Sequence, residues 1–267
     1  MALHNAHEGY EYQDLLTIYC ILRELINENK AEFKIDEKIF EEDKFDDLRI
    51  LKENMIEQMQ VKYSNEDVSY TLSKTDLAAK GNHKIPLDLL FNSWKETNKI
   101  LEGKNLEYRL CLAWNPPIED DKIQDVIFEN NSLNKTFEDT KIYQVDVNKL
   151  WPVGGRPLVS WQRLRTESEK IDREEFREFC NSLIIEVNFP KASLDIERPG
   201  QLEKQVALLV EKLGIGKYPN NNININEAIL KLAHLVKSVR AKSRDEKIRT
   251  NYIISYLNLV TDYGSIN

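Results

Sequence analysis

Cysteine and histidine are scarce in this 267-residue sequence, and their positions argue against two kinds of site. The three cysteines, Cys20, Cys111 and Cys180, lie far apart, each within an apolar run. Such cysteines are typical of buried, reduced thiols and not of a disulfide framework. The four histidines are scattered, and none has the spacing of a metal motif such as His-Glu-x-x-His. We therefore expect a protein of a reducing compartment, without a zinc site.

Long apolar runs and glycine-rich phosphate loops are missing too. No stretch approaches the roughly 18 to 20 apolar residues that cross a bilayer, and residues 1–8 lack the basic and apolar regions of a secretory signal. Neither Gly-x-x-x-x-Gly-Lys-Ser/Thr nor Gly-x-Ser-x-Gly occurs, which argues against a P-loop nucleotide site and an α/β-hydrolase. We expect a cytoplasmic protein with no membrane partner.

Acidic residues outnumber basic ones, 45 against 37, which gives a net charge of −8. This balance argues against a protein that coats nucleic acid through bulk electrostatics. The same balance does not exclude an enzyme that contacts a phosphodiester in one local groove. The basic residues that could line such a groove, each also typical of a solvated surface, are Lys62, Lys74, Lys80, Lys84, Arg156, Arg163 and Arg165.

Hydrophobic periodicity predicts a mixed α/β protein. Helical spacing of apolar residues predicts helices over 12–26, 87–101, 176–183, 201–213, 227–239 and 250–263. Alternating or short apolar runs predict strands over 34–40, 47–51, 56–63, 108–114, 142–147 and 184–189. The polar run 219–224 is the best internal boundary. We therefore expect a mixed domain over residues 1–215 and a helical extension over residues 216–267.

One group of polar residues on neighbouring predicted strands could carry chemistry. Gln58, Gln60 and Lys62 share a face of the strand 56–63, because residues two apart in a strand point the same way. A short turn after the preceding strand could bring Asp47 within reach of them. Asp47 and Gln60 offer oxygen ligands for Mg²⁺, and Lys62 offers a positive charge beside a phosphate. The alternative is that these residues form the solvated face of an antiparallel strand.

The stretch Asp47-Leu48…Gln60-Val61-Lys62 resembles the Asp…(Glu/Gln)-x-Lys core of the PD-(D/E)XK nuclease superfamily. It is similar above all to the double-stranded-DNA endonuclease domain of bacterial anti-phage effectors. That domain occurs in CBASS effectors and at the N-terminus of STAND-type antiviral NTPases.

Two further segments extend the resemblance to roughly residues 8–115. Gly9-Tyr10-Glu11-Tyr12-Gln13 is similar to the Gly-aromatic-x-aromatic-Gln opening of the family. The segment 40–48, Phe-Glu-Glu-Asp-Lys-Phe-Asp-Asp-Leu, is similar to its Glu…Asp-Asp-hydrophobic strand. The resemblance implies a restriction-endonuclease-like core, with a central mixed sheet flanked by helices, and a C-terminal helical segment.

The resemblance also implies a role for particular residues. Asp47 and Gln60 would hold Mg²⁺ or Mn²⁺, Lys62 would assist hydrolysis, and Gln13 would complete the site from the first helix. Asp46 competes with Asp47 as the acidic ligand, since adjacent carboxylates on a strand point to opposite faces. Whether Glu41 or Glu42 adds another acid stays open.

The implied function is hydrolysis of phosphodiester bonds in double-stranded DNA by a metal-dependent endonuclease of a bacterial anti-phage defence protein. We expect a homo-oligomer and, beyond residue 267, a C-terminal sensor or NTPase domain. Two alternatives stay open. One is a catalytically inactive, nuclease-like module for oligomerisation or DNA binding in a larger defence protein. The other is a ribonuclease on the same core, since a hydrolytic metal site does not itself choose between sugars.

Overall fold

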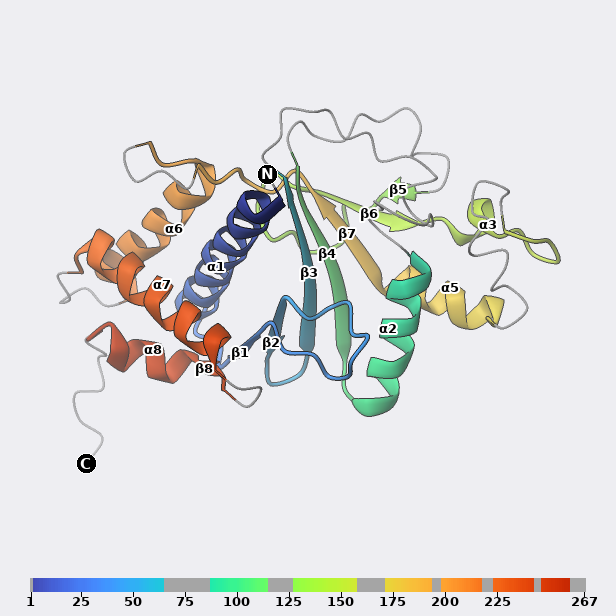
Figure 1. Cartoon of the computed structure of the whole chain (residues 1–267), viewed down its shortest axis with the longest axis horizontal. Helices are drawn as coiled ribbons and strands as arrows, with labels where there is room; N and C mark the ends of the chain where they lie inside the picture. The colour runs from blue at the N-terminus through green and yellow to red at the C-terminus, as the bar shows by residue number, and fades with distance from the viewer. Residues whose placement is uncertain are drawn as a thin grey trace. The chain divides into compact units, whose positions relative to one another are not determined.

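The computed structural model describes residues 2–64, 87–114, 127–157, 171–193, 198–217, 223–242 and 246–259 (Figure 1). Within these ranges the strands form one eight-stranded mixed sheet in the order β5-β6-β7-β4-β3-β2-β1-β8. The expected mixed α/β class, with a central sheet, flanking helices and C-terminal helices, is confirmed. The strands are β1 (Glu32–Ile35), β2 (Leu48–Leu51), β3 (Ile56–Ser64), β4 (Leu106–Trp114), β5 (Ile127–Glu129), β6 (Lys141–Val145), β7 (Leu183–Val187) and β8 (Ile248–Arg249).

The chain divides into two compact units, and each is assembled from separate chain segments. The first unit contains Met1–Glu37, Asp47–Ile56 and Pro190–Asn267. The second contains Lys38–Asp46 and Glu57–Phe189. The predicted division at residue 215 is a different one, and it stays a prediction.

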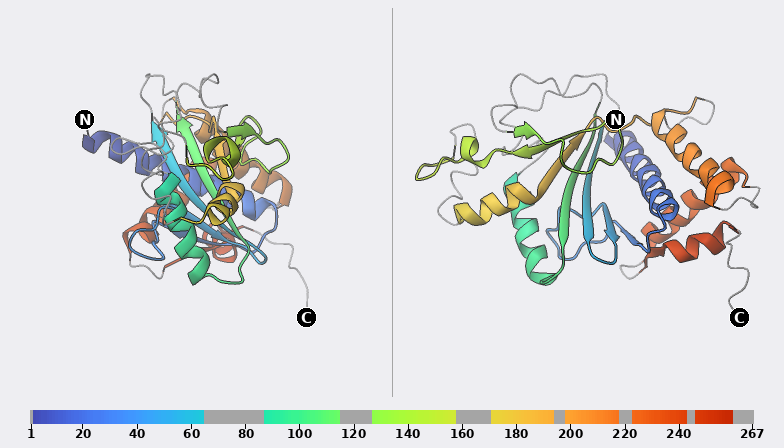
Figure 2. Two further views of the ribbon diagram at one scale, coloured as in Figure 1. Left: turned by 90° about the vertical axis from the view of Figure 1, so that its right-hand side faces the viewer. Right: turned by 180° about the vertical axis from the view of Figure 1, so that it is seen from behind.

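The first unit is built around the long helix α1 (Ala2–Ile26), against which C-terminal helices pack (Figures 1 and 2). Leucine and isoleucine side chains of α1, such as Leu16 and Ile21, are fully buried. The strands of this unit pair antiparallel, with Phe33 opposite Ile50. The C-terminal helices are α6 (Gln201–Lys212), the π-helix η2 (Leu213–Lys217), α7 (Ile225–Ala241) and α8 (Thr250–Tyr256).

The second unit has an aromatic and aliphatic core between its strands and helices. Strands β4 and β7 run parallel, with Leu110 opposite Ile185, and both residues are buried. Phe91 and Phe176, with ring centroids 5.5 Å apart, bring two helices together over this core. Edge-on and tilted aromatic pairs of this kind add to the stability that apolar burial provides. The helices are α2 (Leu87–Ile100), α3 (Val147–Leu150) and α5 (Arg173–Ser182).

Most predicted elements are present with ends close to those expected. The exceptions are the first helix, which begins at Ala2 and not at residue 12, the last helix, which ends at Tyr256 and not at residue 263, and one strand that is shorter. The segment predicted as a strand over 34–40 leaves strand geometry after Ile35, because Asp36 adopts a left-handed backbone with φ of 49°. That conformation turns the chain out of the ladder, and aspartate tolerates it better than most residues. The strands β5 and β8 and the helix α3 are too short to produce a periodic signal, and they were not predicted.

The three cysteines are buried, as their apolar surroundings predict. Burial raises the pKa of the Cys180 thiol, which keeps it protonated at neutral pH. None of the helices in the described ranges combines the length and apolar character needed to cross a membrane.

Candidate functional site

Strand β3 carries two of the predicted site residues, Gln60 and Lys62. Its first six residues are buried, and its last three are half-buried. Gln58 is fully buried and Gln60 is 7% exposed, although strand alternation places both on the face that also holds Lys62. A solvated strand face therefore does not describe Gln58 or Gln60. Along this face of β3 the side chains change from the buried amides of Gln58 and Gln60 to the half-buried lysine Lys62.

Asp47 stands directly before β2 and is half-buried. Its carbonyl oxygen accepts a hydrogen bond of 3.2 Å from the backbone N–H of Asp36, just beyond the register pair Ile35–Leu48. This bond continues the β1–β2 ladder by one step and fixes the backbone at Asp47. The buried Leu48 that follows anchors the strand in the core.

Gln13 lies on α1 and is half-buried. Its Oε1 atom is buried and has no hydrogen-bond partner within the part of the chain that the structure describes. The preceding residue, Tyr12, is fully buried and donates a hydrogen bond of 3.0 Å from its hydroxyl to the carbonyl oxygen of Pro190, which holds this turn of the helix in place. A buried acceptor without a partner costs about 1–3 kcal/mol. The Gln13 oxygen is therefore a position where an external donor would be stabilised.

The predicted residues are distributed over both compact units. Asp47 and Gln13 belong to the first unit, and Gln60 and Lys62 belong to the second. The pairing of Asp47 with Gln60 and Lys62 accordingly stays a prediction.

The competing acid, Asp46, ends the loop 38–46 of the second unit. It is half-buried, and burial raises the pKa of its carboxyl group. Its carboxylate forms an ion pair with the ammonium group of Lys38, 3.8 Å away. Glu41 and Glu42, the other open candidates, are both exposed on the same loop.

The loop 38–46 is organised by Asp43, a buried residue to which sequence reasoning gave no role. Its carboxylate accepts hydrogen bonds from the backbone N–H groups of Ile39 and Phe45, both at 3.1 Å. It also accepts one from the hydroxyl of Ser93 on α2 at 2.9 Å. The signal in the sequence is an aspartate two residues before a buried aromatic, because aspartate commonly bonds the N–H two residues ahead in a turn.

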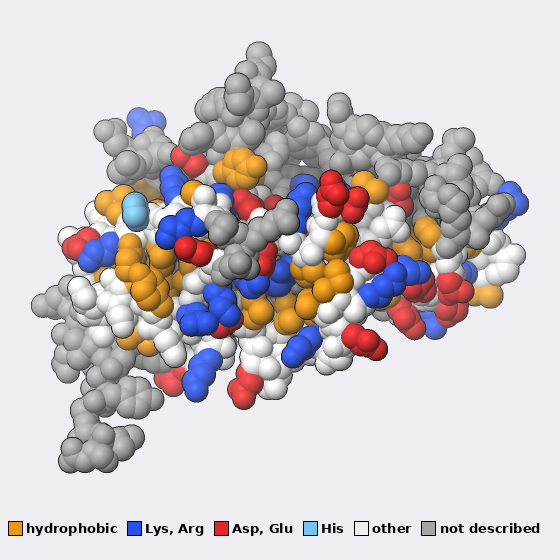
Figure 3. Space-filling view, turned by 60° about the horizontal axis from the view of Figure 1, so that its bottom comes forward, with side chains coloured by type: hydrophobic (Ala, Val, Ile, Leu, Met, Phe, Trp, Pro, Cys, Tyr) orange, Lys and Arg blue, Asp and Glu red, His pale blue; other side chains and the backbone are white. Residues whose placement is uncertain are grey.

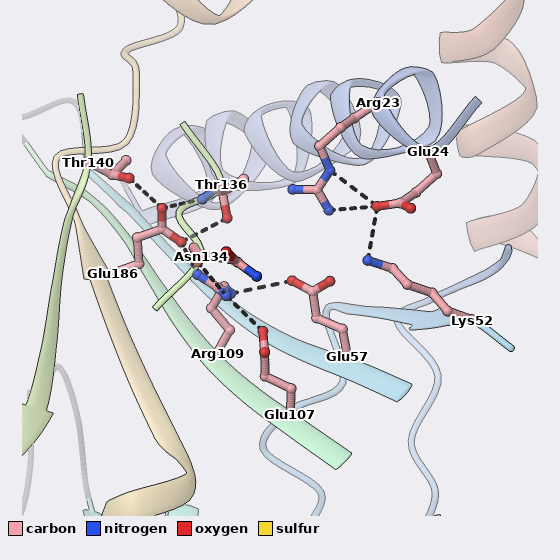
Figure 4. A network of polar contacts seen from close by, with 10 residues as sticks. All are labelled: Arg23, Glu24, Lys52, Glu57, Glu107, Arg109, Asn134, Thr136, Thr140 and Glu186. Carbon is pink, nitrogen blue, oxygen red and sulfur yellow. Dashed lines mark hydrogen bonds and ion pairs between the residues drawn. The ribbon is translucent and has the colours of Figure 1, made fainter. Parts of the chain in front are cut away.

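A buried polar network in the second unit was also missed (Figure 4). Arg109 on β4 is 3% exposed and lies among three carboxylates. Its guanidinium pairs with Glu57 at 3.3 Å, with Glu107 at 2.7 Å and with Glu186. Burial by itself lowers the pKa of Arg109, but the three carboxylates, Glu186 first, raise it above its usual value. The charge of Arg109 is therefore fixed, and it compensates buried acids.

Glu186 on β7 is the most deeply buried acid of this network, at 0% exposure. Besides Arg109, its carboxylate accepts bonds from the backbone N–H of Thr136 at 2.6 Å, from the Thr136 hydroxyl at 2.7 Å and from the Thr140 hydroxyl. These bonds tie the segment before β6 to the sheet. The network has the connections of a structural element, and its member Glu57 belongs to the strand that carries Gln60.

A second ionic cluster, in the first unit, links α1 to the end of β2 (Figure 4). Glu24 is 1% exposed; its carboxylate pairs with Lys52 at 3.0 Å and accepts hydrogen bonds from Arg23 and Asn29. Burial pushes the pKa of Glu24 upward, but the Arg23 charge, the Asn29 bond and Lys52 outweigh it and lower the pKa. Lys52 directly follows β2, so this contact holds the strand that Asp47 precedes against α1.

The residues of the metal prediction are described, whereas most of the candidate DNA-contacting residues are not. Among the described residues, no group of three or more His, Cys, Asp or Glu side chains is arranged to hold a metal ion. The predicted ligand pair, one carboxylate and one amide, is a smaller set than that. Of the candidate basic residues, Lys62 is half-buried and Arg156 is exposed. Lys74, Lys80, Lys84, Arg163 and Arg165 lie outside the described residues.

Charged side chains of both signs are interspersed on the face drawn in Figure 3.

No protein-family model, curated protein or solved structure matches the chain. A functional assignment therefore depends on the motif and on the residues that carry it.

Proposed function

We propose that the chain is a metal-dependent endonuclease that hydrolyses phosphodiester bonds of double-stranded DNA. The observation that carries the proposal is the arrangement of Gln60-Val61-Lys62 on β3, with a buried amide followed by a half-buried lysine at the emerging end of the strand. An ordinary strand face would leave such a glutamine in water. A buried polar side chain requires compensating partners, and a bound cation at the amide oxygen would supply one.

The two proposed ligands are oxygen donors, the type that suits a divalent metal. The Asp47 carboxylate and the Gln60 amide oxygen would hold Mg²⁺ or Mn²⁺, both of which prefer oxygen ligands. When bound, such an ion supplies positive charge for the phosphate and lowers the pKa of a water molecule. Lys62 would hold a compact positive charge beside the phosphate or the attacking water. Gln13, whose buried oxygen has no hydrogen-bond partner among the described residues, would accept a hydrogen bond from a water molecule and orient it.

The proposed biological setting follows from the motif resemblance. The domain would be the effector of a cytoplasmic bacterial anti-phage defence protein, working as a homo-oligomer and controlled by a C-terminal sensor or NTPase domain. Oligomerisation would restrict cutting until a signal arrives.

Cleavage of linear and supercoiled double-stranded DNA with Mg²⁺ or Mn²⁺ tests the proposal. We expect Asp47→Asn and Lys62→Met to lower the rate at least about 100-fold, the scale for removing one preorganised electrostatic group. Lys95→Met is the matched control, because Lys95 is a partly exposed lysine of the second unit whose known partner is Glu175. Chelation of divalent ions should stop cutting. Equal rates for all variants, or cutting that survives chelation, would contradict the proposal.

A non-catalytic nuclease-like module is the second candidate, favoured by the amide of Gln60 where the family more often has a carboxylate. This module would bind DNA or oligomerise, with no cutting in any metal, and Lys62→Met would leave assembly unchanged. Gln60→Glu separates the two candidates further, because an added anionic ligand should tighten metal binding in an active site. Parallel assays on duplex RNA distinguish a ribonuclease on the same core.

A further inference from the structure

Arg240, near the end of α7, contacts two other parts of the first unit, the helix α1 and the residue that follows β1. Its Nη1 atom lies 2.7 Å from Oδ1 of Asp14 on α1, and its Nε atom lies 2.6 Å from Oδ2 of Asp36. Nη1 also donates a hydrogen bond of 3.2 Å to the carbonyl oxygen of Tyr10, whose ring lies 5.2 Å from the guanidinium. The two carboxylate contacts are ion pairs and lack the alignment of hydrogen bonds. One cation therefore holds a helix and a strand end together.

Asp36 connects Arg240 to a predicted metal ligand. Its side chain pairs with Arg240, and its backbone N–H donates to the carbonyl oxygen of Asp47. Asp36 also has a left-handed backbone, which is rare outside glycine and persists when surrounding contacts fix it. Arg240 places a positive charge 2.6 Å from its carboxylate. The backbone position of Asp47 therefore depends, through one residue, on the guanidinium of α7.

Asp14 connects Arg240 to the second predicted residue of the same unit. It directly follows Gln13 on α1 and is 5% exposed. The bond from Arg240 to the Tyr10 carbonyl fixes the preceding turn of the helix. Because Tyr10, Gln13 and Asp14 lie within about one helical turn, these two contacts fix the rotation and axial position of α1 where Gln13 projects.

We propose that Arg240 is a positioning residue, which sets the places of Asp47 and Gln13 by holding Asp36 and Asp14 at once. This inference rests on the proposed nuclease function and deepens it, since it assigns α7 a part in control of the active site. Helix α7 lies in the segment 216–267 that is predicted to lead toward a sensor domain. A displacement of α7 would move both site residues together. Misplacement of a reacting group by about 1 Å is enough to cost roughly 100-fold in rate.

Arg240→Gln removes the charge and keeps a long polar side chain. We expect its maximal cleavage rate to fall about 10- to 100-fold and its half-saturating Mg²⁺ concentration to rise, with little change in the KM for DNA. Arg240→Lys retains the charge without the planar guanidinium, so its cleavage rate should lie between those of the wild type and Arg240→Gln. The matched control is Arg249→Gln, since Arg249 belongs to the same unit and pairs with Glu32 at 2.8 Å. Unchanged rate and Mg²⁺ dependence in Arg240→Gln would overturn the inference.

Amide hydrogen exchange supplies a readout that does not need cleavage. We expect the Asp36 amide to exchange at least about 10-fold faster in Arg240→Gln, because its bond to Asp47 opens more often, and to be unaffected in Arg249→Gln. If the wild-type chain cuts no DNA, the proposed function fails, but faster Asp36 exchange would still support the positioning role. Unchanged exchange would overturn that role whether or not the chain cuts.

Asp36→Asn tests whether Arg240 acts through Asp36, because it removes the ion pair and keeps the backbone bond to Asp47. The double variant Arg240→Gln/Asp36→Asn should be no slower than Arg240→Gln, since both changes break one chain of contacts. Independent effects, with the two losses of rate multiplying, would overturn the inference. This comparison stays informative if Arg240→Gln lowers stability, because Asp36→Asn leaves the Arg240–Asp14 pair in place.

Discussion

At the scale of single residues, Arg109 shows how one buried cation can organise several acids. Arg109 is almost fully buried among Glu57, Glu107 and Glu186, and its single charge pairs with all three acids. Taking charges out of water is expensive, and removing one partner of a buried pair leaves an uncompensated charge. The network therefore stabilises the fold only while all of its members are present.

Arg109→Met should lower the free energy of unfolding by about 3–5 kcal/mol, the usual cost of breaking a buried ionic group. Urea denaturation measures this loss as a lower midpoint. Arg177→Met is the control, because Arg177 forms an exposed pair with Glu174 and should cost less than about 1 kcal/mol. A loss for Arg109→Met no greater than that of the control would contradict the compensating role.

Asp14 makes stability depend on pH in the opposite sense to an ordinary surface aspartate. Burial raises its pKa from 3.8 to about 6, although Arg240 and Lys237 partly counter this effect and Asp36 adds to it. The folded state thus binds the proton more tightly than the unfolded state. This contribution is fully present below about pH 4 and is lost as the pH rises through about 6.

Asp14→Asn should remove this dependence. The wild-type stability minus that of the variant should fall by about 2–3 kcal/mol between pH 4 and pH 7, since one pKa unit corresponds to about 1.4 kcal/mol. Urea denaturation at several pH values measures the difference, and groups common to both proteins cancel. A difference that is constant across this range would show that Asp14 titrates as it does in the unfolded chain.

At the scale of elements, sequence reasoning succeeded where the signal was long and local. The helix α2 and the strands β3 and β4 were predicted within two residues at each end, because their apolar residues repeat over nine or more positions. The strand predicted over 34–40 was too long, since alternation continues through Asp36 while the backbone turns there. Strands of two or three residues, such as β5 and β8, contain too few positions for a period to appear.

In the candidate site, too, local features could be predicted from the sequence and long-range contacts could not. The Gln60–Lys62 motif is local, so its strand and shared face could be predicted from the sequence. The Arg109–Glu186 pair joins residues 77 positions apart, and Arg240 reaches Asp14 across more than two hundred. No periodicity encodes such contacts; they appear only when the chain folds. Asp43 combines both kinds of contact: its bonds from Ile39 and Phe45 are local, but its bond from Ser93 comes from a distant helix.

At the scale of the whole chain, the first unit unites the N-terminal helix with the C-terminal helices. Strongly buried side chains of the last helices include Leu232 and Val236 of α7 and Ile253 of α8. Helices α7 and α8 both pack against α1. In the predicted division, by contrast, residues 216–267 form an extension to a domain that is already complete at residue 215. The two arrangements predict different stabilities for a chain that lacks residues 216–267.

A chain ending at residue 215 should lose cooperative unfolding or fail to fold. Full burial of a large aliphatic side chain contributes about 1.5–3 kcal/mol. Losing Leu232, Val236 and Ile253 alone therefore removes roughly 5 kcal/mol or more, comparable to the whole stability of many domains. The loss also exposes the face of α1 on which Asp14 meets Arg240. Thermal unfolding followed by circular dichroism compares this chain with the full one, and a cooperative transition near the original temperature would instead support a self-contained domain over residues 1–215.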